Sequence, residues 1–471
     1  MGIELVRHLQ NVDFTFSGPA LVNLPQFIEF LLQGDEAKCH RIDGVFSKKN
    51  CRGVLALGNS ATKKASDQDQ LTEGIGLLGR ELDINVPVDL EYDGFLDSFR
   101  SKFGNQNIEP YLLFETSRGC WWGQKSHCTF CGLNGGTMNY RAMRSDAAVE
   151  LMQGLLDRYA GQVNHFSSVD NIVPKNYFTE VFPRLQVPAN ASMFYEVKAD
   201  LRNEEMHVLA QAHVFDIQPG IESLSSSTLR LMRKGTTAFG NLQFLRGAAL
   251  YGIKPCWNLL IGFPGETEEV FQKYLDDIPL LTHLPPPSGT FPVRFDRFSP
   301  YFDQAEAYHL DLHPLDFYRL SYPFDDGVLR NIAYYFSDHN YKAAYITAMT
   351  RFIKPLQDKI RDWRARWQAT EDLLPPRLYF KQGAGSGVIY DSRSGAALVH
   401  QLNQEETIVL RALETPNDLD LLAKSILMDP DQIQLSITSL SDKRLLFSER
   451  TRWMSLVLPE APAISRRRSY H

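Results

Sequence analysis

Six apolar segments between residues 111 and 301 alternate with segments of helical periodicity, and this alternation limits the possible folds more than any other feature. The predicted strands cover residues 111–117, 163–170, 191–199, 214–223, 255–263 and 293–301. Strands that alternate with helices are typical of parallel βα units. Six successive units predict an α/β fold with a barrel or partial barrel, whose functional residues gather at the carboxyl ends of the strands.

The segments on either side of this repeat have different patterns. Residues 12–33 predict a short strand, a turn and an amphipathic helix, which together form the last piece of an α/β unit. Residues 59–74 are polar and lack aromatic side chains, which predicts a flexible loop. Residues 311–375 predict mostly helix. The predicted parts of the chain are 1–105, 106–310, 311–375 and 376–471.

The last part, residues 376–471, predicts a winged-helix-like domain. It contains two short strands, three short helices and a terminal hairpin, and Asn403 and Glu406 have the spacing of a capping box. Many winged helices bind DNA, but these helices carry few basic residues, and the whole chain has a net charge of −7. We therefore expect peptide binding against the edge of the hairpin, and no nucleic-acid partner.

Three of the six cysteines, Cys120, Cys128 and Cys131, form a C-x7-C-x2-C pattern just after the first strand. Sulfur ligands suit zinc or an iron–sulfur cluster. A [4Fe–4S] cluster held by three cysteines leaves one iron free for another ligand. Zinc would need a fourth ligand, and His127 is awkwardly placed because it directly precedes Cys128; structural zinc sites also more often use two separated cysteine pairs. Packed free cysteines are the third reading, and the cluster is the favoured one.

The rest of the composition fits a protein of the reducing cytoplasm. No apolar run reaches the ~20 residues of a membrane helix, and the first residues lack the apolar core of a signal peptide. Six cysteines in 471 residues, three of them close together, do not predict a disulfide framework.

Several phrases together carry a resemblance to a known family. They are "RGCWWGQKSHCTFCGLNGGTMNYR", "FYEVKADLR", "QPGIESLSSSTLRLMRKGTT", "NLLIGFPGE" and "RFSPY". Within the six-fold βα pattern they resemble the radical S-adenosylmethionine (SAM) superfamily, and in particular its branch that matures ribosomally synthesised and post-translationally modified peptides (RiPPs). The commonest spacing in that superfamily is C-x3-C-x2-C, from which the x7 gap departs. The resemblance covers roughly residues 1–310, and the C-terminal domain less specifically.

The resemblance implies a fold and a chemistry. The fold would be a partial (β/α)6 radical SAM barrel between an N-terminal remnant of a cobalamin-type α/β domain and the winged-helix-like domain. Cys120, Cys128 and Cys131 would ligate a [4Fe–4S] cluster, and SAM would bind the open iron. Reduction would cleave SAM to methionine and a 5′-deoxyadenosyl radical that abstracts a substrate hydrogen.

The cysteine loop and the sixth strand supply the first group of predicted cofactor contacts. An aromatic ring inside the C-x2-C turn can lie near adenine, and the glycine-rich backbone that follows can approach a ligand closely. Two side chains of the sixth strand, two residues apart, share a face. These predicted contacts are Phe130, Gly132, Asn134, Gly135, Arg297 and Ser299.

Strands two to five supply the second group. A serine and an aspartate end the second strand, where the SAM ammonium needs acceptors. Glu196 and Lys198 share a face of the third strand, where they would contact the ribose hydroxyls and the SAM carboxylate. A glycine and a glutamate follow the fourth strand, and an asparagine lies inward on the fifth. The contacts predicted here are Ser168, Asp170, Glu196, Lys198, Gly220, Glu222 and Asn258.

A purely structural role is an alternative explanation for several of these residues. Asp170, Glu222 and Glu266 are about as well explained as strand-end or helix caps. Glu196 is a poor cap candidate, because a carboxylate in so apolar a strand needs a partner. Cys256 begins an apolar strand and is predicted to be a small buried side chain.

Many members of the resembled branch are cobalamin-dependent methyltransferases. Residues 1–60 match only the tail of a cobalamin domain, and no D-x-H-x-x-G sequence occurs. We therefore predict a reaction without cobalamin. Candidates are excision of a tyrosine-derived fragment to leave an α-keto-β-amino acid, epimerisation and crosslinking. Two alternatives stay open: a cobalamin-dependent peptide C-methyltransferase completed by another chain, and a zinc-bearing, non-catalytic peptide-binding scaffold.

The resemblance also implies partners. They are a precursor peptide with leader and core, an electron donor such as flavodoxin or ferredoxin, and optionally a separate recognition protein. No membrane partner is expected.

Overall fold

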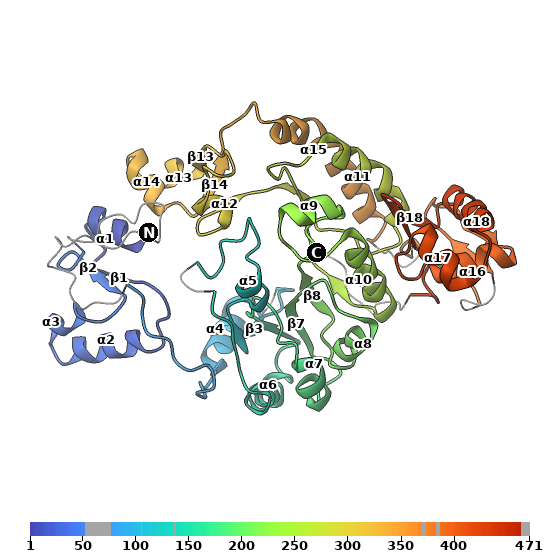
Figure 1. Cartoon of the computed structure of the whole chain (residues 1–471). Coiled ribbons are helices and arrows are strands. Elements are labelled where there is room, and N and C mark those ends of the chain that lie inside the picture. The colour runs from blue at the N-terminus through green and yellow to red at the C-terminus, as the bar shows by residue number, and fades with distance from the viewer. Residues whose placement is uncertain (52–76, 105, 136–137, 369–373, 383–386, 463–471) are drawn as a thin grey trace. The chain divides into compact units, whose positions relative to one another are not determined.

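The structure of the protein is a computed structural model that describes residues 1–51, 77–104, 106–135, 138–368, 374–382, 387–462. The chain forms two compact units (Figure 1). The first consists of residues 1–88, 119–143 and 294–341, and the second of residues 89–118, 144–293 and 342–471. The loop predicted at residues 59–74 lies outside the described residues.

A parallel sheet of five strands forms the centre of the second unit. Its spatial order follows the chain: β3 (Tyr111–Phe114), β6 (His165–Ser168), β7 (Ser192–Val197), β8 (Asp216–Pro219) and β9 (Lys254–Pro255). β10 (Leu259–Ile261) then pairs in parallel with β11 (Thr290–Pro292). The predicted α/β fold with successive parallel βα units is confirmed.

The sixth predicted strand, residues 293–301, is wrong in position. The parallel strand lies earlier, at β11, and only β12 (Phe295–Asp296) falls inside the predicted range. The extended run stops there because Phe298 has a φ of 70° and Ser299 caps the short helix α12 (Pro300–Asp303). The predicted fifth strand is likewise divided into β9 and β10.

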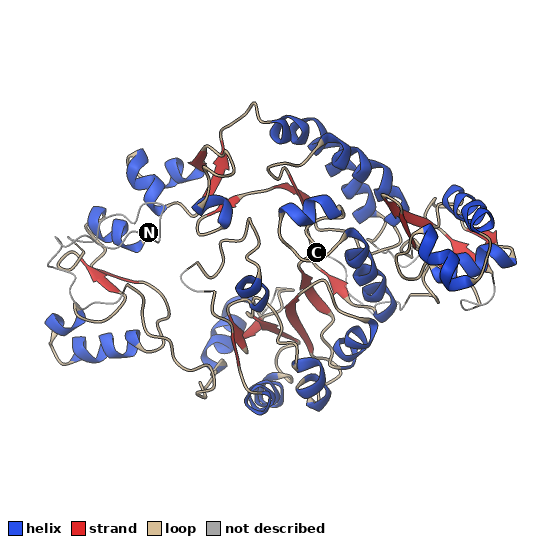
Figure 2. Cartoon of the chain, in the orientation of Figure 1, coloured by secondary structure: helices blue, strands red, loops and turns tan. Residues whose placement is uncertain are grey.

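Helices of the second unit flank the sheet, as Figure 2 shows. They are α4 (Asp93–Phe103), α6 (Ser145–Tyr159), α7 (Tyr177–Glu180), the 3-10 helix η1 (Phe182–Arg184), α8 (Asn203–Gln211), α9 (Ser226–Leu231), α10 (Ala238–Tyr251), α11 (Glu268–Leu281) and α15 (Ala344–Ala365). α10 shows why such helices begin and end where they do. The Thr237 side chain caps its first turn, and Gly252 ends it with a φ of 67°.

Alternation along β7 separates the two faces of the sheet. Met193, Tyr195 and Val197 are buried, whereas Phe194 and Glu196 are partly exposed. Because successive strand side chains point to opposite faces, one face packs into the core and the other is open to ligands.

The C-terminal part contains the predicted helices and hairpin. β15 (Leu378–Phe380), β16 (Val388–Asp391) and β17 (Leu398–Gln401) form an antiparallel sheet. α16 (Gln404–Ala412), α17 (Leu419–Ile426) and α18 (Pro430–Asp442) precede the hairpin of β18 (Leu446–Glu449) and β19 (Arg452–Ser455). The predicted capping box of α16 is confirmed: Asn403 accepts from the Glu406 amide at 2.7 Å, and Glu406 accepts from the Asn403 amide at 3.1 Å.

Buried polar side chains join this part to the helices of the parallel sheet. Arg246 of α10 donates to the carbonyl oxygens of Val457 at 2.9 Å and Glu414 at 3.3 Å. The ring of His283 contacts the carbonyl of Leu456 at 2.9 Å. Burial lowers the pKa of Arg246 to about 10. Hydrogen bonds of this kind fix the contact, because breaking them would leave buried groups without partners.

The first unit has three small parts. The first part contains α1 (Gly2–His8), β1 (Phe14–Phe16), α2 (Asn23–Leu32), α3 (Glu36–Cys39) and β2 (Val45–Ser47). The strand and the helix predicted within residues 12–33 are therefore confirmed. The second part is the cysteine loop, which contains α5 (Trp121–Lys125) and β5 (Arg141–Ala142). The strand just before the loop, β4 (Ser117–Arg118), belongs to the second unit.

The third part of the first unit is an antiparallel sheet in the order β12, β14 (Tyr335–Asp338), β13 (Leu312–Pro314), with helices α13 (Phe317–Ser321) and α14 (Asp326–Ile332). The range 311–375, predicted as a helical connector, therefore contains strands as well as helices. Within the described ranges, no helix combines the length and apolar character needed to cross a bilayer.

Replacing Arg246 with methionine should lower the free energy of unfolding by about 2 kcal/mol, since two buried carbonyl groups lose a charged donor. Urea unfolding followed by circular dichroism measures this loss. Arg364 on α15 is exposed, so Arg364→Met should change stability by less than ~0.5 kcal/mol. Equal effects of the two substitutions would contradict the role of Arg246.

Candidate functional site

The three motif cysteines lie in one loop of the first unit, and none of them forms a disulfide bond with another described residue. Cys120 is the N-cap of α5, and its sulfur accepts from the Gly123 amide at 3.3 Å. The Cys131 amide donates to the Cys128 carbonyl at 3.2 Å, which closes the C-x2-C turn. The thiolate is the form of cysteine that binds metal.

The donor set fits an iron–sulfur cluster. His127, the fourth ligand that zinc would need, directs Nε2 to the Cys131 carbonyl at 2.7 Å. Among the described residues, no three His, Cys, Asp or Glu side chains are grouped as ligands of one metal ion. The cysteines of a [4Fe–4S] cluster each bind a different iron atom, so they need not converge on one point.

The glycines of this loop pack against their own chain. A Cβ atom at Gly132 would overlap the carbonyl oxygen of Arg297, and one at Gly135 would overlap the ring of Phe298. Asn134 between them has a φ of 61°. The Tyr301 amide also donates to the Thr129 carbonyl at 2.9 Å. The space that these glycines leave open is thus occupied by the 296–301 segment of the same chain. Contact between the glycines and a cofactor stays a prediction.

Arg297 and Ser299 do not share a strand face, because β12 ends before both. The Arg297 guanidinium donates to the carbonyl oxygens of Ala333 at 2.7 Å and of Arg330. Burial lowers the pKa of Arg297. Ser299 is fully buried and accepts from the Phe302 amide at 3.2 Å. Both side chains form hydrogen bonds that hold the 296–301 segment, which packs against the cysteine loop. Their contact with SAM stays a prediction.

Asp170 and Ser168 join the chain after β6 to the chain after β3. The Asp170 carboxylate accepts from the Thr116 amide at 2.7 Å and from the Thr116 hydroxyl at 2.5 Å. The Ser168 hydroxyl accepts from the Asp170 amide at 3.0 Å. Burial raises the pKa of Asp170. These contacts match the alternative in which Asp170 is a strand-end cap.

Glu196 has the environment of a ligand-binding carboxyl. It lies on the partly exposed face of β7, and its carboxyl group makes no hydrogen bond or ion pair with another residue of the described part. Burial, and then the negative charge of Glu222, raise the pKa of Glu196 to about 7, while the Lys234 ammonium lowers it. A half-buried carboxyl without a protein donor is suited to accept from a bound molecule.

Glu222 and Lys234 form an ion pair beside Glu196, with Nζ 3.4 Å from Oε1. A Cβ atom at Gly220 would lie 2.8 Å from the Lys234 Nζ, so glycine there makes room for the lysine. Glu222 has a φ of 56°. Sequence reasoning missed Lys234, whose only signal was its place in a basic turn, 233–234, after α9.

Two further side chains on the sheet were predicted to contact the cofactor, Lys198 and Asn258. Lys198 pairs with Asp200 at 3.0 Å. Asn258 is exposed between buried Trp257 and buried Leu259. The prediction that Cys256 is buried is wrong, because the same alternation places it on the exposed face and Trp257 in the core.

Glu266 closes the turn after β10. Its carboxylate accepts from the amides of Gly262 at 2.7 Å and Phe263 at 3.1 Å, and from the Thr228 hydroxyl at 2.8 Å. Burial raises the pKa of Glu266 to about 7. The carboxyl thus holds the turn to α9, a capping role rather than a ligand contact.

Residues 114–278 match the family model described as the Radical SAM superfamily. The chain carries a radical SAM domain. The matched range contains the three cysteines and the strands from β6 to β10. The cofactors of this superfamily are a [4Fe–4S] cluster and SAM, which agrees with the three cysteines of the loop.

Several solved structures are similar to the chain. TsrM from Kitasatospora setae, a radical SAM methyltransferase with cobalamin and a [4Fe–4S] cluster bound, has 17% identity and a TM-score of 0.45 over 64% of this chain and 55% of that chain. The cobalamin-dependent SAM radical enzyme OxsB has 14% identity and a TM-score of 0.41, covering 92% and 55%. Coproporphyrinogen III oxidase (HemN) from Escherichia coli has 12% identity and a TM-score of 0.32, covering 78% and 90%.

The chain thus spans 55% of the length of TsrM and OxsB. No curated protein matches its sequence.

Replacing Gly132 with alanine should displace the C-x2-C turn, because the new methyl group overlaps the Arg297 carbonyl oxygen. After anaerobic reconstitution, the variant should bind substantially less iron per chain than the parent protein. Gly154→Ala on α6 is the control, since a Cβ there meets nothing within 4 Å. Iron binding by Gly132→Ala at the parent level would contradict this packing.

Replacing Glu196 with glutamine should stabilise the ligand-free protein at pH 8 but not at pH 4. A carboxyl whose folded pKa rises from 4.5 to about 7 contributes stability that is fully present below pH 4.5 and is lost as the pH rises through 7. The expected gain at pH 8 is about 2 kcal/mol, measured by urea unfolding at both pH values. The same gain at both would show that charge is not its cause.

Proposed function

We propose that this protein is a radical SAM enzyme that modifies a ribosomally synthesised precursor peptide without cobalamin. The observation that carries the proposal is the set of three cysteines in C-x7-C-x2-C spacing, inside a range that matches the radical SAM superfamily. Three thiolates leave one iron of a [4Fe–4S] cluster open, as SAM binding requires.

The chain's own residues would bind, orient and shield. Cys120, Cys128 and Cys131 would hold the cluster. The cluster and SAM supply, when bound, a 5′-deoxyadenosyl radical that removes a hydrogen atom from the substrate. Glu196 would accept hydrogen bonds from SAM hydroxyl groups, because it has no protein donor of its own among the described residues. The Glu222–Lys234 ion pair beside it supplies one charge of each sign.

Peptide binding is supported by the free edge of β17 in the C-terminal part. In the described residues, β17 pairs only with β16. Leu398 and Val399 of β17 are 48% and 52% exposed. An extended peptide can add to such an edge through main-chain hydrogen bonds. A leader segment bound this way would present the core to the radical SAM domain, and a separate recognition protein and a flavodoxin or ferredoxin donor complete the proposed system.

The reaction proposed after hydrogen abstraction is backbone or carbon–carbon chemistry: excision of a tyrosine-derived fragment, epimerisation or a crosslink. Cobalamin-dependent methylation, the activity named for TsrM, is the outcome that would replace it.

The first test is anaerobic reconstitution of the full chain with iron and sulfide. The parent protein should take up iron and absorb broadly in the visible range, whereas Cys120→Ala, Cys128→Ala and Cys131→Ala should not. Cys256→Ala is the matched control, because that exposed cysteine lies outside the motif. A colourless protein that binds zinc instead would overturn the proposal.

Co-expression with candidate precursor peptides from the same genome region then identifies the reaction by mass spectrometry. A crosslink removes two hydrogens, epimerisation leaves the mass unchanged, and excision removes a large fragment. Gain of a methyl group together with tight cobalamin binding would replace the proposed chemistry with methyl transfer. A cluster-loaded protein that leaves every such peptide unchanged, by mass and by stereochemistry, would remove the peptide substrate.

A further inference from the structure

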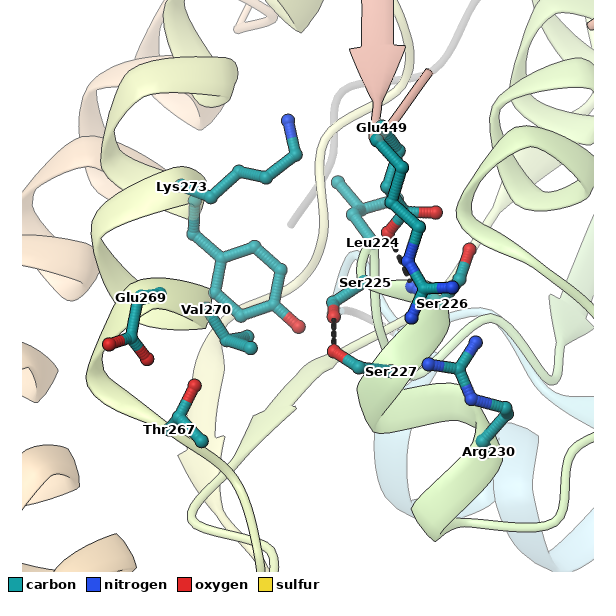
Figure 3. Close-up of a pocket in the computed structure, with 12 residues that line it drawn as sticks. Leu224, Ser225, Ser226, Ser227, Arg230, Thr267, Glu269, Val270, Lys273 and Glu449 are labelled. Carbon is teal, nitrogen blue, oxygen red and sulfur yellow. Dashed lines mark hydrogen bonds between the residues drawn. The ribbon is translucent and has the colours of Figure 1, made fainter. Parts of the chain in front are cut away.

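The second unit has a pocket of about 270 Å³ between α9 and the first turns of α11 (Figure 3). Its lining carries charges of both signs, because Arg230, Lys273 and Arg450 lie among the carboxylates Glu269 and Glu449. Such a lining does not select one class of ligand. A more specific arrangement lies in the first unit, where the hydroxyl group of one tyrosine reaches the cysteine loop.

This tyrosine, Tyr334, lies between α14 and β14. A Cβ atom added at Gly132 would lie 2.8 Å from the Tyr334 hydroxyl oxygen. Gly132 directly follows Cys131, so the hydroxyl lies beside the last of the three predicted cluster ligands. Both segments belong to the first unit. The negative charge of Cys131 also acts on Tyr334, which agrees with this proximity.

Contacts of the backbone and of the ring hold Tyr334 in place. Its amide donates to the Tyr318 hydroxyl at 2.9 Å, and its carbonyl accepts from the Arg297 amide at 2.7 Å. The ring packs edge-on against the rings of Phe298 and Tyr335, with centroid distances of 6.5 Å and 5.0 Å. These contacts fix the direction in which the hydroxyl group points, as a group that acts on a metal ligand requires.

The Tyr334 hydroxyl is a donor that makes no hydrogen bond with another described residue. Burial and the negative charges of Asp296 and Cys131 raise the pKa of Tyr334 to about 12, so the group keeps its proton at neutral pH. Asp296 is the competing acceptor, and its carboxylate already accepts from the Arg294 Nε at 2.8 Å. A proton-bearing donor therefore lies next to the Cys131 sulfur.

We propose that the Tyr334 hydroxyl donates a hydrogen bond to the Cys131 thiolate when that thiolate holds the [4Fe–4S] cluster, and that this bond makes the cluster easier to reduce. The reduced cluster carries one more negative charge, so a hydrogen bond to one of its sulfurs stabilises the reduced state and raises the reduction potential. Tyr334 is thus a positioning residue that acts through a ligand. The inference rests on the cluster of the proposed function and needs no peptide substrate.

The test measures the reduction potential of the cluster in the reconstituted full-length protein, without SAM, by electron paramagnetic resonance. Tyr334→Phe removes only the hydroxyl group. It should lower the equilibrium constant for one-electron reduction at least ~tenfold, which is a fall of about 59 mV in the potential. Tyr335→Phe is the matched control, because it removes the hydroxyl of the neighbouring ring, whose centre lies 3.7 Å from the Arg294 guanidinium. Its potential should equal that of the parent protein.

Pulsed electron paramagnetic resonance of the reduced cluster in D₂O gives a second measurement. The parent protein and Tyr335→Phe should show a coupling to an exchangeable deuteron that is missing from Tyr334→Phe. Identical couplings in all three proteins, or an unchanged potential in Tyr334→Phe, would overturn the proposal.

Two other results would also overturn the hydrogen bond to Cys131. A potential that differs between Tyr334→Phe and the parent protein only when SAM is present would assign the hydroxyl to SAM. Loss of iron uptake in Tyr334→Phe, with uptake at the parent level in Tyr335→Phe, would assign it a structural role. A parent protein that takes up no iron would instead contradict the proposed function, so the two failures are distinguishable.

Discussion

The packing of the cysteine loop against the segment 296–301 is the constraint on which the candidate site depends. In its described residues the loop has no long helix or strand, since α5 spans only Trp121–Lys125. Its position relies on the Tyr301–Thr129 backbone hydrogen bond and on the absence of side chains at Gly132 and Gly135. Arg297 and Ser299 hold that segment through bonds to backbone groups. Residues that look like cofactor contacts in the sequence thus also determine where the thiolates lie.

Three carboxyl groups with raised pKa values differ in what they bind. Asp170 accepts from Thr116 and joins two strand ends, and Glu266 accepts from two amides and a hydroxyl to close a turn. Both have protein donors, so burial alone does not mark them as functional. Glu196 has no such donor in the described ranges, and its neighbours are an ion pair rather than a hydrogen-bonding shell. Among the three, the missing donor makes Glu196 the candidate for ligand binding.

Much of the fold could be predicted from the sequence, because residue periodicity and capping patterns depend on interactions between residues close together in the chain. The period-two and helical alternations predicted the parallel sheet, and the Asn403–Glu406 spacing predicted the start of α16. The error at the sixth strand had a local signal too, since Ser299 before Pro300 is a helix start. The Glu222–Lys234 pair and the Thr116–Asp170 bond join residues distant in the chain, and no local pattern reveals such partners.

The polar anchors around Arg246 have a consequence for any peptide held on the C-terminal part. Arg246 and His283 bond to its backbone, and Arg393 donates to the Leu280 carbonyl of α11 at 2.8 Å. These buried hydrogen bonds hold the C-terminal part against its neighbours in the second unit. We therefore expect the distance from its strand edge to the parallel sheet to vary little. Which residue of a bound peptide reaches the sheet would then depend on how many residues separate it from the captured segment, and lengthening that spacer would move the reacting position along the peptide.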